Sequence, residues 1–188
     1  ARTKGLGVAA ILGCAGPTLT GTEKVFFRQA DPWGFILFAR NIESSSQVAA
    51  LTQELRNCVG RDAPILIDQE GGRVQRLRPP IAREWLPPLD QVRKSAPAKA
   101  DRGLYLRYRI IAAELKALGL DVNCAPTADI AGRQTHPFLR NRCLGENALD
   151  VTRNALATAQ GLMGGGVLPV FKHAPGHGRA GVDSHLDV

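Results

Sequence analysis

The 188-residue sequence contains no apolar run that approaches the roughly 20 residues a membrane-spanning helix needs. Aromatic residues are also scarce, at 5% of the chain. A nucleic-acid binder is expected to show a basic stripe with interleaved aromatics, and that pattern is missing although the net charge is +7. The remaining composition, 44% hydrophobic and 22% charged, is typical of a soluble globular protein. We therefore predict a globular protein that binds neither membranes nor nucleic acid.

Cysteine is sparse and widely spaced. Cys14, Cys58, Cys124 and Cys143 form no C-x-x-C pair, which argues against a zinc knuckle or a disulfide framework. Three of them lie in apolar or helical contexts, where cysteine behaves as a small core residue. This usage predicts a reducing, cytoplasmic location. The basic start and the apolar stretch after it resemble a signal peptide, but three glycines within residues 5–15 favour a buried first strand.

Apolar runs alternate with helical periodicities along the chain. The runs predict five strands, at residues 7–12, 35–38, 64–67, 120–124 and 167–171. The periodicities predict helices from Thr20 or Thr22 to about residue 30, and over 44–60, 98–118 and 147–163. Residues 79–97 hold five prolines and no clear periodicity, which predicts an irregular crossing segment. Pro169 cannot donate to a strand ladder, so a bulge is expected in the fifth strand.

The alternation of elements predicts the fold. Strands that are apolar on both faces and are separated by helices indicate a parallel α/β sheet. No G-x-G-x-x-G follows the first strand, so a dinucleotide-binding fold is not supported. Polar clusters follow strands two to five at their carboxyl ends, where the active site of a (β/α)8 TIM barrel lies. Because such a barrel typically needs about 250 residues, we predict that residues 1–188 are the N-terminal part of a single TIM-barrel domain, the first five β/α units of an apparently truncated chain.

The first polar cluster is Asp68-Gln-Glu70-Gly-Gly-Arg73-Val-Gln-Arg76, which begins where the third predicted strand ends. An aspartate at a strand tip can accept hydrogen bonds from two adjacent sugar hydroxyls, and the two glycines would let the backbone approach a ligand closely. Arg76 could reach the same ligand from across the turn. Glu70 is either a second ligand-binding group or a structural partner of Arg73 or Arg76, and the sequence leaves both readings open.

The second cluster is the last seventeen residues, which contain three of the four histidines. One reading is a zinc-dependent hydrolase that uses His173, His177, Asp183 and His185. Against it, the proline and glycine between the first two histidines prevent a helix that would align them, and the H-x-H-x-D-H ligand run is missing. The other reading pairs Asp183 with His185, which fixes the tautomer of the imidazole and leaves its second nitrogen free for proton transfer. Lys172 would then donate to a hydroxyl or an anion.

Two long motifs carry a resemblance to a known family: the run from Asp68 to Arg76, and Lys172-His-x-Pro-Gly-His-Gly-x4-Asp-Ser-His185. From Gly34 onward the chain resembles the bacterial family 3 glycoside hydrolases, the β-N-acetylglucosaminidases (β-hexosaminidases) of the NagZ type. The resemblance implies a cytoplasmic TIM-barrel hydrolase that works without metal or cofactor and retains the anomeric configuration. Its expected partner is a small carbohydrate, GlcNAc-1,6-anhydroMurNAc or its peptides, from which it would remove terminal non-reducing N-acetylglucosamine in cell-wall recycling. A monomer is expected.

The motif positions also imply residue roles. His185 would be the general acid/base and Asp183 its partner. Five residues would hold the sugar: Asp68, Arg76, Arg142, Lys172 and His173. The run Asn141-Arg142-Cys143 differs from the Glu-Arg-Ser expected there, although the arginine is retained. A retaining glycosidase also needs a carboxylate nucleophile, which the resemblance places beyond Val188.

Overall fold

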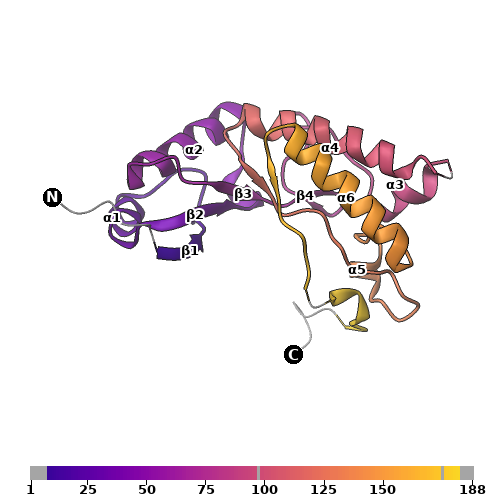
Figure 1. The fold of residues 1–188 in the computed structure, drawn as a ribbon. Helices are drawn as coiled ribbons and strands as arrows, with labels where there is room; N and C mark the ends of the chain where they lie inside the picture. Colours follow the sequence, from indigo (N-terminus) through magenta and orange to yellow (C-terminus); the bar gives the residue numbers. More distant parts are fainter. Residues whose placement is uncertain (1–7, 97, 175, 183–188) are drawn as a thin grey trace.

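The structure, a computed structural model, describes residues 8–96, 98–174 and 176–182. Its main sheet has five parallel strands in the order β1-β2-β3-β6-β7 (Figure 1). These strands span Val8–Leu12, Pro32–Leu37, Ile65–Ile67, Val122–Asn123 and Leu168–Pro169. A separate antiparallel pair, β4 (Gln69–Gly71) and β5 (Val74–Gln75), follows β3 directly. The five predicted strands are therefore present, and the parallel sheet is confirmed.

Helices connect the strands, and α2, α4 and α6 lie along the same side of the sheet (Figure 1). The helix bounds are α1 Gly21–Ala30, α2 Ser45–Val59, α3 Pro88–Lys94, α4 Ala100–Ala117, α5 Pro137–Arg140 and α6 Ala148–Gly164, with short 3-10 turns η1 Ala39–Asn41 and η2 His177–Arg179. The prediction of an irregular segment over residues 79–97 was wrong for α3. Pro88 lies in the first turn of this seven-residue helix, where its missing N–H is not needed, and so short a helix shows little periodicity.

Capping hydrogen bonds fix the ends of the helices. The Thr20 hydroxyl accepts from the Glu23 N–H at 3.2 Å, and the Glu23 carboxylate accepts from the Thr20 N–H at 2.8 Å, which completes a capping box on α1. Ser44 caps α2 and Asn147 caps α6 with side-chain oxygens that accept from the backbone N–H groups of Gln47 and Asp150. Gly60 ends α2 with φ 64°, in the left-handed region that glycine adopts readily.

The core lies between the central strands and helices α2 and α4. It is formed by fully buried aliphatic and aromatic side chains, among them Phe35, Leu37, Ile65, Ile67, Leu55, Leu104, Tyr108 and Ile111. The parallel register sets Phe35 beside Ile65 and Leu66 beside Val122. Because the core fixes this register, the carboxyl ends of β3, β6 and β7 meet at one edge of the sheet.

The two outer strands differ from the expectations. Leu168 N donates to Asp121 O at 2.8 Å, and Val170 N donates to Asn123 O at 3.0 Å. Pro169 lies between these two residues, so its nitrogen is on the side of β7 that faces away from β6. The register of β7 is regular, so the predicted bulge was wrong: the Pro169 nitrogen faces away from β6 and removes no hydrogen bond from the ladder with that strand. At the other edge, Val8 is 60% exposed, so the first strand is present but is not buried.

Two further observations concern the predictions from composition. All four cysteines are free; Cys14 and Cys143 are buried, while Cys58 and Cys124 are half-buried. Across residues 8–96, 98–174 and 176–182, no helix is both long and apolar enough to cross a membrane.

Candidate functional site

Polar side chains gather where the carboxyl ends of β3, β6 and β7 meet. A cleft of about 550 Å³ lies there, a volume typical of small-molecule sites. Its lining residues are Asp68, Arg73, Val74, Arg76, Phe138, Arg142, Lys172, His173 and His177. The structure therefore brings all five residues that were predicted to hold a sugar into one cleft, although they are spread over 106 positions of the sequence (68 to 173).

The loop after β3 is held by buried amides. Gln69 N donates to the Asn123 side-chain oxygen, and the Asn123 amide donates back to Gln69 O, both at 3.0 Å, which ties the end of β3 to β6. The Gln69 side-chain oxygen also accepts from the backbone N–H groups of Arg76 and Leu77 at 3.0 Å. These buried bonds are costly to break because an unpaired buried amide loses its full solvation. They fix Asp68 and Glu70 on either side of Gln69.

Asp68 accepts hydrogen bonds from two cations. Its Oδ1 lies 2.8 Å from Lys172 Nζ, and its Oδ2 lies 3.0 Å from Arg76 Nη2. Burial alone would raise the pKa of Asp68, but the charges and hydrogen bonds of Lys172 and Arg76 outweigh it and hold the pKa below its ordinary value. Asp68 is thus an ionised acceptor in the wall of the cleft.

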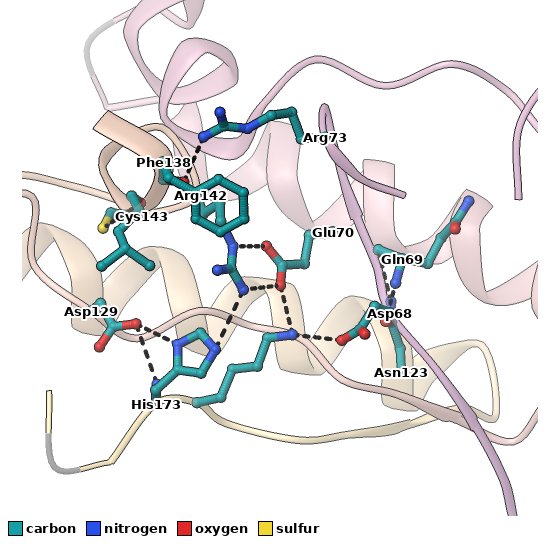
Figure 2. A network of polar contacts seen from close by, with 12 residues as sticks. Asp68, Gln69, Glu70, Arg73, Asn123, Asp129, Phe138, Arg142, Cys143 and His173 are labelled. Atoms are coloured by element: carbon teal, nitrogen blue, oxygen red, sulfur yellow. Dashed lines mark hydrogen bonds and ion pairs between the residues drawn. The ribbon is translucent and has the colours of Figure 1, made fainter. Parts of the chain in front are cut away.

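Glu70 pairs with Arg142 and shares Lys172 with Asp68. Its side chain is 1% exposed, and it accepts a bidentate pair from Arg142 at 2.8 Å and 3.0 Å and an ion pair from Lys172 Nζ at 2.6 Å (Figure 2). The pKa of Arg142 is raised because the bonds and charge of Glu70 outweigh burial, which alone would lower it. The predicted structural partners of Glu70, Arg73 or Arg76, were wrong, because Arg142 lies 72 positions away in sequence and only the fold brings it there.

Gly71 and Gly72 make room for protein neighbours. They have φ values of 108° and 61°, and a Cβ at Gly71 would collide with the Arg107 guanidinium, as a Cβ at Gly72 would with Pro87. Arg107 Nη2 in turn donates to Glu70 O at 2.5 Å and to Leu86 O at 2.8 Å. These glycines therefore allow Arg107 to hold the Glu70 backbone. That they also let the backbone approach a ligand stays a prediction.

His173 is oriented by an acidic residue that the sequence analysis did not single out. Asp129, which follows β6, is 4% exposed, and its Oδ2 lies 2.7 Å from His173 Nδ1. Arg142 Nη2 lies 3.3 Å from the other ring nitrogen, Nε2. An arginine can only donate, so Nε2 accepts, and the ring proton belongs on Nδ1, where it is donated to Asp129. The sequence does indicate Asp129 in one respect: like Asp68, it lies in a loop that follows a strand.

Burial would raise the pKa of Asp129, but the hydrogen bonds from the His173 ring and from the backbone amides of Gly178 and His173 hold it below its ordinary value. Asp129 therefore stays ionised and accepts from the His173 ring. Lys172 and His173 are placed by the continuation of β7: Lys172 N donates to Pro126 O at 3.1 Å, and Ala128 N donates to Lys172 O at 2.6 Å.

The remaining predicted residues lie at the end of the chain. Asp183 and His185 are outside the described residues, so their pairing stays a prediction. His177 lines the cleft with its ring centroid 5.3 Å from that of His173, at an interplanar angle of 81°. Within the described ranges, no group of three or more His, Cys, Asp or Glu side chains is arranged to hold a metal ion.

Residues 176–182, which include the 3-10 turn η2, lie beside α5 (Figure 1). His136 N donates to Ala180 O at 3.1 Å, and the Thr135 hydroxyl donates to Gly178 O. A Cβ at Gly178 would collide with the Ile130 carbonyl, so a larger residue would push the two segments apart. Residues 176–182 therefore run along the α5 side of the cleft.

A parallel α/β sheet with a polar cleft at its carboxyl edge is the arrangement of a barrel hydrolase, and residues 24–188 match the model of the glycosyl hydrolase family 3 N terminal domain. The chain belongs to glycosyl hydrolase family 3, whose N-terminal domain has a TIM-barrel-like α/β fold. The predicted family and fold class are confirmed.

Individual relatives are β-hexosaminidases. The chain is 37% identical over 181 residues to the beta-hexosaminidase of Nitrosomonas eutropha, which covers 95% of this chain and 51% of that protein. A structure of NagZ from Neisseria gonorrhoeae with N-trifluoroacetyl-D-glucosamine superposes with a TM-score of 0.86 at 33% identity, covering 97% of this chain and 54% of the other. Another structure of that NagZ is a complex with a zinc ion, with a TM-score of 0.83 at 31% identity, covering 91% and 52%. The chain thus spans about half the length of these relatives.

Proposed function

We propose that the full-length protein is a retaining exo-β-N-acetylglucosaminidase that hydrolyses terminal non-reducing N-acetylglucosamine from peptidoglycan fragments. The observation that carries the proposal is the charged network in the cleft, in which Asp68, Glu70 and Asp129 hold Arg76, Arg142, Lys172 and His173 in fixed positions. Family membership supports it, as does the N-trifluoroacetyl-D-glucosamine bound by the related Neisseria gonorrhoeae protein.

The network suits a sugar because it alternates acceptors with donors. A sugar hydroxyl both donates and accepts, so neighbouring hydroxyls can give a proton to the Asp68 carboxylate while they accept from Lys172 or Arg76. Lys172 and Asp68 are about 14% and 15% exposed, so they can reach a ligand while they remain paired. The pairs also hold the side chains in place before binding, which reduces the ordering that a ligand must impose.

In the proposed mechanism the acid/base group is His185, with Asp183 as the acceptor that fixes its tautomer. The nucleophile is an aspartate beyond Val188 that would form the covalent glycosyl intermediate of a retaining enzyme. Action in cell-wall recycling, in the cytoplasm and as a monomer, belongs to the same proposal. The described residues contribute the sugar cradle.

The geometry of His173 disfavours the zinc-hydrolase reading. Its Nδ1 is engaged by Asp129 at 2.7 Å, and its Nε2 faces the positive guanidinium of Arg142 at 3.3 Å, so a dication would have to displace one of these partners. A metal ligand needs a free nitrogen lone pair and a tolerable charge environment. No observation on the described residues favours zinc catalysis.

The test is release of 4-nitrophenol from 4-nitrophenyl N-acetyl-β-glucosaminide by the full-length protein, with and without a chelator. We expect hydrolysis that resists the chelator and is lost in His185→Ala. Activity that the chelator abolishes and zinc restores would favour the metal reading, and undiminished activity in His185→Ala would remove that residue from the mechanism. Arg153→Ala is the control, because Arg153 pairs with Asp150 on the surface of α6.

A further inference from the structure

Two consecutive side chains of α4 donate to a single backbone carbonyl, that of Glu70. Arg107 Nη2 donates to Glu70 O at 2.5 Å, and the Tyr108 hydroxyl donates to the same oxygen at 3.0 Å. Arg107 Nη2 also donates to Leu86 O at 2.8 Å. Both donor residues are buried, since Arg107 is 2% exposed and Tyr108 is 1% exposed. Arg107 and Tyr108 together are called the α4 clamp below.

The residue that the clamp holds is also the one that joins two cations of the cleft. The Glu70 carboxylate accepts a bidentate pair from Arg142 (Figure 2) and an ion pair from Lys172, and both cations line the cleft. The preceding residue, Gln69, is tied to β6 through Asn123, whereas the Glu70 carbonyl is held from α4. A shift of the Glu70 backbone would therefore move the carboxylate that fixes Arg142 and Lys172.

Arg107 is a costly residue at this buried position. Its Nε and Nη1 atoms are buried and have no hydrogen-bond partner among the described residues. Burial lowers the pKa of Arg107, because a charged guanidinium loses its hydration there. Its guanidinium carbon lies 5.3 Å from the centroid of the Trp85 ring, so an unbranched apolar side chain could pack beside Trp85 without leaving donors unpaired. Such departures from good packing are expected chiefly at functional sites, so the cost indicates a role in the site.

We propose that Arg107 and Tyr108 are positioning residues for sugar binding: the α4 clamp fixes the Glu70 backbone, and Glu70 fixes Arg142 and Lys172 for the sugar. This inference rests on the proposed function and deepens it. Neither clamp residue lines the cleft, so both act through Glu70. A cradle that is ordered in advance spares the ligand the cost of ordering it, and the same cradle holds the sugar before and during the reaction. Loosening the clamp therefore weakens binding in the ground state and in the transition state alike.

The experiment measures Kd for N-acetylglucosamine by titration calorimetry, and KM and kcat for 4-nitrophenyl N-acetyl-β-glucosaminide, all on full-length protein. Tyr108→Phe removes one donor and keeps the shape of the side chain, and Arg107→Met removes the other donor together with its charge. We expect each variant to raise Kd and KM about fivefold and to leave kcat within about twofold of wild type, because a loss of uniform binding raises KM alone. Arg107→Lys keeps the charge and a donor, so it should restore part of the affinity. Tyr108→Phe carries the test if Arg107→Met does not fold.

The matched control for Tyr108→Phe is Thr52→Val. The Thr52 hydroxyl is also buried and donates to a backbone carbonyl, that of Leu118 at 2.9 Å, at the C-terminal end of α4. Its loss should lower the urea midpoint as much as Tyr108→Phe does, while Kd and KM stay at their wild-type values. A double-mutant cycle then tests the route through Glu70: in a Glu70→Gln background, Tyr108→Phe should raise Kd by much less than it does in wild type.

Each opposing outcome is distinct. An unchanged Kd in Tyr108→Phe and Arg107→Met, or an equal rise in Thr52→Val, overturns the positioning role and leaves the proposed function standing. Additive effects of Tyr108→Phe and Glu70→Gln on Kd also overturn it, since the clamp would then not act through Glu70. A wild-type protein that binds N-acetylglucosamine but hydrolyses no glucosaminide overturns the proposed function alone, because Kd still decides the role of the clamp. A wild-type protein that does not bind N-acetylglucosamine overturns both.

Discussion

The replacement Glu70→Gln probes the group on which the cleft network depends. Glu70 is 1% exposed and accepts from Arg142 and Lys172, which are 8% and 14% exposed. Removing one partner of a buried ion pair typically costs about 3–5 kcal/mol, because the other charge stays buried without compensation. Lys172 keeps its bond to Asp68, so we expect the lower end of this range, about 3 kcal/mol.

The assay is urea unfolding of the full-length protein, followed by tryptophan fluorescence. With a slope of about 3 kcal/mol per molar urea, a loss of 3 kcal/mol moves the midpoint down by about 1 M. Glu84→Gln is the matched control: it makes the same chemical change in a pair with Arg78 whose side chains are 54% and 46% exposed. Exposed pairs contribute about 0–1 kcal/mol, so its midpoint should hardly move.

Equal midpoints for the two variants would refute the reasoning, since they would mean that Glu70 contributes no more than a surface carboxylate. A large midpoint shift for Glu70→Gln with an unchanged affinity for N-acetylglucosamine would contradict the claim that Glu70 also organises the cleft for sugar binding. In that case the network would stabilise the fold without organising the cleft.

Four further predictions follow from the geometry. In acid-unfolding curves, the stability of Asp68→Asn should fall less steeply than that of wild type as the pH drops from about 5 to 2. The reason is that the pKa of Asp68 in the folded protein lies below the ordinary 3.8, so wild type loses the stability contributed by the ionised carboxylate as the pH falls through that lower value. Nitrogen-15 NMR should find the His173 proton on Nδ1 in wild type and a mixture of tautomers in Asp129→Ala; the same tautomer in both would contradict the role of Asp129. Gly71→Ala should destabilise the protein by more than 1 kcal/mol in urea unfolding, as its φ of 108° and the nearby Arg107 predict. Thr20→Ala should cost about 1 kcal/mol through the lost cap, measured as a thermal shift; an unchanged melting temperature would contradict it.

Local patterns predicted most of the fold. The apolar runs identified the strands because a parallel sheet buries both faces, and Thr20, Ser44, Gly60 and Asn147 marked helix ends through their own capping chemistry. The same patterns could not show α3, since a helix of seven residues is too short for a clear period. They also could not show that β1 lies at an edge, because burial depends on neighbours elsewhere in the chain.

The sequence predicted which residues form the site, but not which of them pair with one another. Strand ends pointed to Asp68 and Lys172, the turn after the third strand pointed to Arg76, and the family motif added Arg142 and the sugar-binding role of His173. The pairing of Glu70 with Arg142 spans 72 positions, and that of His173 with Asp129 spans 44, so neither follows from local spacing. The contact between Gly71 and Arg107 could not be predicted for the same reason, because Arg107 comes from a helix more than thirty positions away.

The central claim is that the full-length protein is a retaining β-N-acetylglucosaminidase. Proton NMR of the anomeric signals during hydrolysis of the GlcNAc–MurNAc disaccharide tests it most directly. We predict that N-acetylglucosamine is released first as its β-anomer, with the α-anomer rising only later by mutarotation. Initial release of the α-anomer, or no release at all, would contradict it.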